Sequence, residues 1–219
     1  MHLPDGFLSP PVWGLLDGLA LATVGGCVLV LRRRLPEDAV PRMGMLGAFV
    51  FAAQLVNVPV AAGTSGHLLG GVLVASLLGP AAATLVMASV FAIQCLLFQD
   101  GGILALGANV VNMGLSGTIG GFLLLRLLLR LLPARARKLA LFLAAWFTVV
   151  GSSALVALEL AASGTVPLLS SLAAMVGVHA IIGLVEGAIT VAVVRFVARV
   201  RPEVLAGTVL DPQVPGGAL

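Results

Sequence analysis

The chain has 219 residues, of which 60% are hydrophobic and only 10% are charged, and its mean hydropathy is +1.16. Soluble domains are usually about 45–50% apolar and about 25% charged, so a soluble globular protein is close to excluded. Disorder is excluded because disordered chains combine low hydrophobicity with high charge. A transmembrane β-barrel would show segments of about ten residues with alternating hydrophobicity. This chain has long unbroken apolar runs instead, which argues against a barrel. The composition predicts an all-α integral membrane protein.

Seven segments are apolar enough to be crossings, for which a helix needs about 20 residues. The segment at 66–78 is short for a full crossing, and Gly79-Pro80 separates it from the next. Residues 1–200 are expected to form one seven-helix transmembrane domain, and the Pro- and Gly-rich residues 201–219 a flexible cytoplasmic tail. The predicted crossings are residues 11–31, 43–60, 66–78, 80–98, 103–132, 139–162 and 169–200.

The positions of the basic residues decide whether residues 66–98 cross the membrane once or twice. All 12 Lys and Arg residues fall within 32–42, 126–138 and 195–201. Short loops rich in Lys and Arg stay in the cytoplasm. Two crossings place all three clusters on one side, whereas a single crossing separates them. We therefore predict seven crossings of the inner (plasma) membrane, with the N-terminus outside and the C-terminus in the cytoplasm.

The net charge of +3 and sequence pI of about 9.7 suit cytoplasmic basic loops better than a nucleic-acid interface. Cys27 and Cys95 each lie within an apolar segment, which favours buried small hydrophobic residues over a disulfide or zinc site. The predicted outer side has no Lys or Arg and contains His2 and His67, with His179 in the outer half of the last helix. Neutral imidazoles without competing cations favour cation entry there.

The first two residues offer an unusual set of nitrogen donors. Methionine is expected to stay in front of a histidine, and the start lacks the basic stretch of a cleavable signal peptide. The Met1 amine, the peptide nitrogen of His2 and its imidazole can then chelate one metal ion in a plane. Planar nitrogen donors favour Cu(II) and Ni(II). His67 could fill the open position, although an ordinary structural histidine stays an alternative at both sites.

The opening Met1-His2-Leu3-Pro4-Asp5-Gly6-Phe7-Leu8-Ser9-Pro10 resembles the start of the CbiM/NikM family. These proteins are the substrate-capture components of cobalt and nickel energy-coupling-factor (ECF) transporters. The resemblance covers most of residues 1–195, and its other motifs lie in residues 63–71, 100–113 and 179–190.

The resemblance implies a seven-helix bundle with the N-terminal segment inserted into it. It implies a four-nitrogen metal site made by the Met1 amine, the His2 amide and imidazole nitrogens, and the His67 imidazole. It also implies a membrane coupling protein (the T component), ATPase subunits and often a small accessory membrane protein as partners.

Other polar residues are candidates for supporting this site or bracing the N-terminal loop, since ionisable groups in a membrane are costly and usually functional. Capping, turn formation and hydrogen bonding between helices are the structural alternatives. The candidates are Asp5, Asn57, Thr64, Ser65, Asn109, Asn112, His179 and Glu186.

Small residues recur every four positions in the first two apolar segments, and this spacing lets helix backbones approach closely. They could pack the bundle or dock a partner helix. These residues are Gly14, Gly18 and Ala22 in the first segment and Gly44, Ala48 and Ala52 in the second.

The chain has no Walker-type phosphate loop and no nucleophile–base pair, so we predict a transporter subunit rather than an enzyme, with ATP hydrolysis in partner subunits. The predicted function is capture of Ni(II) or Co(II) outside and release inward, for example toward cobalamin biosynthesis. No organic cofactor is expected. Two alternative functions stay open: a stand-alone metal channel or ion-coupled carrier, and a scaffold for metal-enzyme maturation. The sequence also does not decide whether the transported ion is nickel or cobalt.

Overall fold

The computed structural model describes the chain except for residues 33–34, 36–38, 60–64 and 212–219. Two-residue strands β1 (Val58–Pro59) and β2 (Ser65–Gly66) pair antiparallel, and everything else with regular structure is helical. The helices are α1 (Pro10–Leu31), α2 (Ala39–Gln54), α3 (Gly71–Leu78), α4 (Pro80–Phe98), α5 (Leu106–Asn109), the π-helix η2 (Val110–Gly120), α6 (Gly121–Leu131), the 3₁₀ turn η3 (Ala134–Ala136), α7 (Arg137–Ala162), α8 (Leu168–Val200) and the 3₁₀ turn η4 (Pro202–Leu205).

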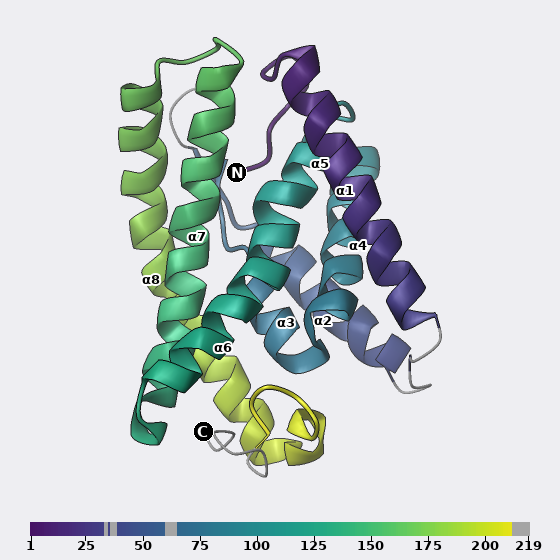
Figure 1. Cartoon of the computed structure of the whole chain (residues 1–219), viewed down its shortest axis with the longest axis vertical. Helices are drawn as coiled ribbons and strands as arrows, with labels where there is room; N and C mark the ends of the chain where they lie inside the picture. The colour runs from purple at the N-terminus through teal and green to yellow at the C-terminus, as the bar shows by residue number, and fades with distance from the viewer. Residues whose placement is uncertain (33–34, 36–38, 60–64, 212–219) are drawn as a thin grey trace.

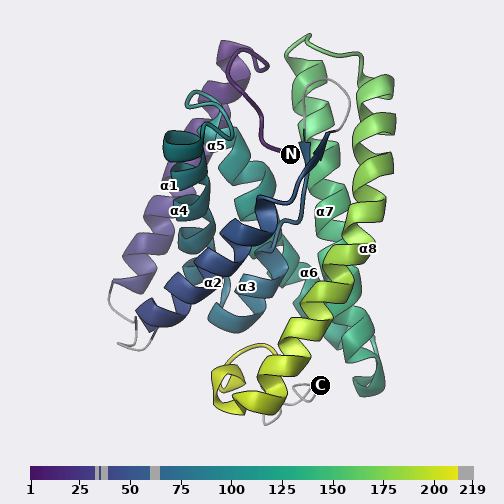
Figure 2. The same ribbon diagram turned by 180° about the vertical axis from the view of Figure 1, so that it is seen from behind.

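The helices form two groups with the N-terminal segment between them. The long antiparallel pair α7 and α8 makes one side of the molecule, and α1, α4 and α5 make the other (Figure 1). From behind, α2 and α3 fill the space toward the lower end (Figure 2). The chain starts in the middle of the bundle, because residues 1–9 run inward from the upper end of α1 (Figure 1).

Five of the helices are long and apolar enough to cross a membrane in the described part of the chain, which identifies a membrane protein. They are Pro10–Leu31, Pro80–Phe98, Leu106–Leu131, Ala134–Ala162 and Leu168–Val200. The other two predicted crossings correspond to α2, with 16 residues, and α3, with 8 residues. Both are shorter than the roughly 20 residues of a full span.

The predicted crossing at 43–60 is wrong at its C-terminal end. The helix α2 stops at Gln54, and the chain turns into the strand Val58–Pro59. Proline restrains the preceding residue to extended conformations and has no amide hydrogen for a helix, so Pro59 favours the strand. The predicted crossing at 66–78 likewise begins late, at Gly71, because Gly70 adopts a positive φ of 80°.

The break between α3 and α4 lies at the Gly79-Pro80 pair. Gly79 has a positive φ of 78°, which favours glycine, and Pro80 occupies the first turn of α4. The apolar stretch of residues 66–98 therefore contains two helices and an extended entry, rather than one continuous helix.

Very close packing joins α3 to the π-helix η2. A methyl group placed on Gly71 would lie 2.6 Å from the Cα atom of Gly117, and one on Gly117 would lie 3.1 Å from the Cα of Gly71. Thr118 of η2 also shares a hydroxyl–hydroxyl hydrogen bond of 2.7 Å with Thr84 of α4. The contact between Gly71 and Gly117 fixes the start of α3, and thereby the end of the loop that precedes it.

The prediction of a flexible tail over residues 201–219 is wrong for residues 202–211, which pack against the bundle. Residues 202–205 form η4, and Leu205 and Leu210 are buried in a cluster with Leu73, Leu77 and Leu125. Burying these two leucines removes apolar surface from water and holds the segment against the bundle. Residues 212–219 lie outside the described residues.

The predicted small-residue stripes face outward. Residues 14, 18 and 22 of α1 and 44, 48 and 52 of α2 are all exposed. A methyl group on Gly14, Gly18 or Gly44 would meet no atom within 4 Å. Packing inside the bundle is therefore excluded for these stripes, and docking of a partner helix stays a prediction.

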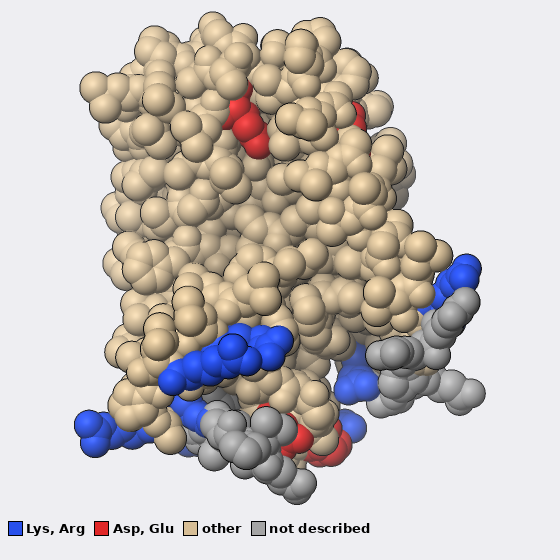
Figure 3. Space-filling view, viewed as in Figure 1, with Lys and Arg blue, Asp and Glu red and all other residues tan. Residues whose placement is uncertain are grey.

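The charges are divided between the two ends of the molecule. The Lys and Arg side chains visible in Figure 3 lie toward the lower end, where the C-terminal segment also lies (Figures 1 and 3). Visible acidic side chains include some in the upper part, and the intervening surface is uncharged. An uncharged band between a basic end and an opposite end without basic residues is typical of a membrane protein.

Candidate metal centre

The first three residues are buried inside the bundle. Met1 and Leu3 are 0% exposed and His2 is 5% exposed. The amide of Leu3 donates to Oδ1 of Asn109 at 2.8 Å, and the Asn109 side chain donates back to the Leu3 carbonyl at 3.1 Å. The Gly102 amide donates to the same carbonyl at 2.8 Å. The main chain beside His2 is thereby fixed to the end of α5 and to the turn after α4.

Asp5 holds the next part of the N-terminal segment. Its carboxylate accepts hydrogen bonds from the amides of Ile103, Leu104 and Ala105, at 3.1, 2.8 and 3.3 Å. These amides precede α5, and a carboxylate at a helix N-terminus is stabilised by the helix dipole. Gly102 is required beside it, since a methyl group there would lie 2.1 Å from the Asp5 carboxylate.

The outer part of the segment is tied to the turn between α7 and α8. The Thr165 hydroxyl donates to the Phe7 carbonyl at 2.5 Å, and the Ser9 amide donates to the Ser163 hydroxyl at 3.0 Å. The segment is thus bound at both ends, with Met1 and His2 at the inner end.

The imidazoles of His2 and His67 meet at the inner end of this segment. Their rings are stacked, with centroids 4.6 Å apart and planes 18° apart, and Phe91 lies edge-on to His2 with ring centroids 5.7 Å apart. His67 is only 2% exposed. Its Nδ1 lies 2.7 Å from the carbonyl of Leu68, so Nδ1 carries the proton and Nε2 keeps its lone pair.

Ring nitrogens of this pair lack hydrogen-bond partners among the described residues. Nε2 of both His2 and His67 is buried without a partner. Nδ1 of His2 also lacks a well-directed hydrogen bond, although it lies 3.2 Å from Oδ1 of the half-buried Asp100. Unpaired buried polar atoms are rare and costly, and they mark positions where an ion or water completes the site.

Burial keeps the nitrogen donors uncharged. Loss of solvent lowers the pKa of the Met1 amine to about 4. Burial also lowers the pKa of His2, and it lowers that of His67 well below the usual range. The nearby His2 imidazole lowers the pKa of the Asp100 carboxyl. Near pH 7 the amine and both imidazoles are therefore neutral, which is the form that binds a metal ion.

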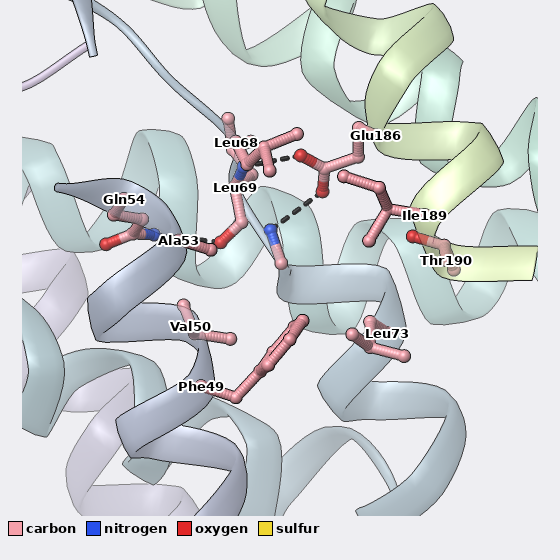
Figure 4. Close-up of a pocket in the computed structure, with 11 residues that line it drawn as sticks. Phe49, Val50, Ala53, Gln54, Leu68, Leu69, Leu73, Glu186, Ile189 and Thr190 are labelled. Carbon is pink, nitrogen blue, oxygen red and sulfur yellow. Dashed lines mark hydrogen bonds between the residues drawn. The ribbon is translucent and has the colours of Figure 1, made fainter. Parts of the chain in front are cut away.

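The loop after β2 that carries His67 is clamped from two helices. Glu186 of α8 accepts hydrogen bonds from the Leu69 amide at 2.5 Å and the Gly70 amide at 2.7 Å. The Gln54 side chain of α2 donates to the Leu69 carbonyl at 2.8 Å. Figure 4 shows Glu186 and Gln54 reaching the loop from opposite sides. The sequence analysis did not predict Gln54 as part of the site. The sequence feature that could have pointed to it is a polar amide near the end of an apolar segment.

Other predicted site residues lie elsewhere. Asn112 donates to Oε2 of Glu159 on α7 at 2.6 Å, and Nδ1 of His179 lies 2.7 Å from the Met175 carbonyl of its own helix. The Asn57 residue is exposed. Thr64 lies outside the described residues, and Ser65 is described only by its main chain in β2.

No group of three His, Cys, Asp or Glu side chains converges on a metal-sized position in the described ranges. A site formed by side chains alone is therefore absent there. The buried amine of Met1 and the peptide nitrogen of His2 are the additional donors beside the two imidazoles. The arrangement can supply nitrogen ligands from the main chain, which suits borderline divalent ions such as Ni(II).

Comparisons with known proteins show which proteins this chain is similar to. Residues 2–204 match the family model CbiM, described as "Cobalt uptake substrate-specific transmembrane region". The "Putative fused nickel transport protein NikMN" of Archaeoglobus fulgidus is 40% identical over 207 residues, which are 94% of this chain and 68% of that protein. The "Cobalt transport protein CbiM" of Sorangium cellulosum is 33% identical, and the match covers 100% of both chains.

A solved structure also shares the fold. The crystal structure of a truncated transition metal transporter superposes with a TM-score of 0.84 and 31% sequence identity, covering 91% of this chain and 99% of that chain. The family model spans most of the sequence, and the similarity to solved and curated relatives extends over nearly all of it. The chain therefore belongs to the CbiM/NikM family of cobalt and nickel transport membrane proteins.

Proposed function

We propose that this chain is the substrate-specific subunit of an ECF-type importer and captures Ni(II) or Co(II) outside the cell. The observation that carries the proposal is the buried pair His2 and His67, with stacked rings and unpartnered nitrogens at the inner end of the N-terminal segment. The four ligands would be the Met1 amine, the His2 amide nitrogen, the His2 imidazole and the His67 imidazole, in a square plane.

Chelation chemistry supports this ligand set. With Met1 as the first residue of the mature chain, its amine and the His2 amide nitrogen close one ring with the metal ion. The nearer imidazole nitrogen, Nδ1, closes a second ring. Asp100 lies 3.2 Å from this Nδ1, and Nδ1 cannot keep that contact while its lone pair binds the ion. Four in-plane nitrogens favour Ni(II), and the same ligand field can be imposed on Co(II).

The distribution of charge supports an orientation. Short basic loops stay in the cytoplasm. The end that carries the Lys and Arg side chains in Figure 3 would then face the cytoplasm, with the C-terminal segment. The upper end, from which the N-terminal segment runs into the bundle (Figure 1), would face outside. In this arrangement α2 and α3 would complete seven segments as two short helices within the plasma membrane.

Release inward would depend on partner proteins. The relative from Archaeoglobus fulgidus is named a fused nickel transport protein and is longer than this chain, consistent with a function shared with other transporter components. We infer that ATPase subunits, a membrane coupling protein and a small accessory membrane protein complete the transporter. The outward-facing small residues of α1 and α2 offer surfaces for the helices of such partners.

Metal titration of the purified chain tests this proposal. We expect the unmodified chain to bind one Ni(II) or Co(II) ion with the absorption of a planar four-nitrogen site. His2→Ala and His67→Ala should each abolish that absorption, because each removes one in-plane ligand. The ratio of the two dissociation constants ranks the metals. Metal binding that is indifferent to both substitutions would contradict the proposed site, and metal transport by the chain alone in liposomes would contradict the need for partners.

Removing the clamp on Leu3 should weaken metal binding without removing a ligand. Asn109→Ala deletes both hydrogen bonds that fix the Leu3 main chain next to His2. We expect Ni(II) affinity to fall about 10–100-fold, the usual effect of losing an outer-sphere contact. Asn112→Ala is the matched control, because Asn112 bonds Glu159 rather than the N-terminal segment. Equal titrations for the two variants would refute the role of Asn109.

A further inference from the structure

The two halves of the candidate metal site are attached to different helices. The residues around Met1 and His2 are fixed by Asn109 at the end of α5 and by Gly102 in the turn before it. The loop of His67 is instead fixed by Glu186 of α8 and Gln54 of α2. Three of the proposed ligands thus share the support of α5. The fourth depends on α8 and α2 as well, in addition to the packing of Gly71 against η2 at the start of α3.

Glu186 is the strongest of these attachments. Its side chain is 3% exposed, and its two oxygens each accept an amide of consecutive residues, Leu69 at 2.5 Å and Gly70 at 2.7 Å (Figure 4). Hydrogen bonds to a carboxylate are shorter and about twice as strong as those between neutral groups. An ionisable residue at membrane depth is costly and marks a functional position. The clamp begins two residues after His67.

The helix that carries Glu186 is itself tightly joined to α7. Gly183 and Gly187 flank Glu186 on α8, and methyl groups at these positions would lie 2.9 Å from Trp146 and 2.6 Å from Phe142. The Trp146 indole also donates to the Ala180 carbonyl at 2.9 Å. Because close-packed helices move as units, a displacement of α8 would carry α7 and the His67 loop with it.

We propose that Glu186 is a positioning residue that holds the His67 imidazole in the plane of the other three nitrogens and couples this ligand to α8. The inference rests on the proposed function. A shift of the α7–α8 pair relative to α5 withdraws the fourth ligand and leaves the other three in place. Phe7 and Ser9 also contact the α7–α8 turn, but the Leu3 clamp separates them from the ligands. Glu186 would therefore link a helix movement to loosening of the bound ion.

A double-mutant cycle with His67 tests this coupling. Ni(II) alone is titrated into the purified full chain, and dissociation constant and ligand-field absorption are recorded. Glu186→Gln leaves an acceptor for only one of the two amides. We expect a 10–100-fold loss of affinity and an absorption band shifted toward that of His67→Ala. In the His67→Ala background, Glu186→Gln should change the affinity less than about twofold, because its effect acts through His67.

The matched control is Glu159→Gln on α7. Glu159 is partly buried and accepts a hydrogen bond from Asn112, but it does not contact the His67 loop. Its affinity and absorption should match those of the unmodified chain. Unchanged binding in Glu186→Gln, an equal loss with and without His67, or an equal loss in Glu159→Gln would each overturn the proposal.

Two further arms separate the possible failures. If the unmodified chain binds neither metal ion, both the proposed function and this inference fail. If His67→Ala weakens binding but Glu186→Gln does not, only the inference fails. Should Glu186→Gln not fold, hydrogen exchange of the unmodified chain decides: the Leu69 and Gly70 amides should exchange as slowly as the core of α8, and rapid exchange would overturn the clamp.

Discussion

A chain lengthened by two residues before Met1 should lose high-affinity binding of Ni(II) and Co(II). The extension converts the proposed amine ligand into a peptide nitrogen. It also forces additional atoms into a position where Met1 is 0% exposed and the Leu3 main chain is held by three hydrogen bonds, with Asn109 and Gly102. We expect an affinity loss greater than the 10–100-fold that accompanies loss of an outer-sphere contact. Titration followed by absorption measures it.

The control for this experiment is the same two residues added after Leu219. That addition leaves the amine unchanged, so the titration should match that of the unmodified chain. If the N-terminal extension binds the ion equally tightly and with the same absorption, the amine is not a ligand. The four-nitrogen site would then have to be abandoned.

Gly71→Ala is expected to destabilise the protein strongly, because the added methyl group would meet main-chain atoms of η2. The new methyl group would lie 2.6 Å from Cα and 2.7 Å from the carbonyl carbon of Gly117, and a main chain cannot turn aside as a side chain can. Overpacking of this kind costs about 1–3 kcal/mol in the free energy of unfolding. Unfolding in detergent, followed by helical circular dichroism, measures the change.

The same substitution should also weaken metal binding, because Gly71 directly follows the residue whose amide is held by Glu186. Gly14→Ala is the matched control: Gly14 lies in α1, and a methyl group there meets nothing within 4 Å. Alanine is also the better helix former by about 1 kcal/mol, so this variant should be neutral or slightly stabilised. A comparable destabilisation in both variants would show that the contact with Gly117 is not responsible.

Composition and short motifs were enough to predict the fold class and one helix boundary. Composition identified a helical membrane protein, and Gly79-Pro80 marked the boundary between α3 and α4, because both residues have narrow backbone preferences. The end of α2 was predicted wrongly because the prediction relied on hydropathy there and not on backbone preferences. Hydropathy measures whether residues 55–59 tolerate lipid, but it does not report that Val58–Pro59 forms a strand that pairs with Ser65–Gly66.

The predicted site residues divide according to how far away their partners lie. Asp5 was a candidate for bracing the N-terminal loop, with capping of a turn as the alternative, and its carboxylate accepts hydrogen bonds from the amides of Ile103, Leu104 and Ala105. Glu186 and His179 were both candidates and, seven residues apart on α8, lie on one helix face. Only Glu186 reaches the loop, which lies 116 and 117 residues earlier in the chain. Periodicity along one helix identifies a shared face and says nothing of which loop lies opposite it.

The buried start of the chain sets an order for its own folding. The partners of residues 3–9 include residues 102–109 and 163–165, and the contacts of Phe7 and Ser9 span 158 and 154 residues. This segment therefore cannot complete its contacts until most of the chain has been made. Contacts of such separation form late. In a chain synthesised from Met1, enzymes that process the nascent end therefore have a period of access to it. Where translation begins with formylmethionine, the formyl group must leave in that period, before the end is enclosed.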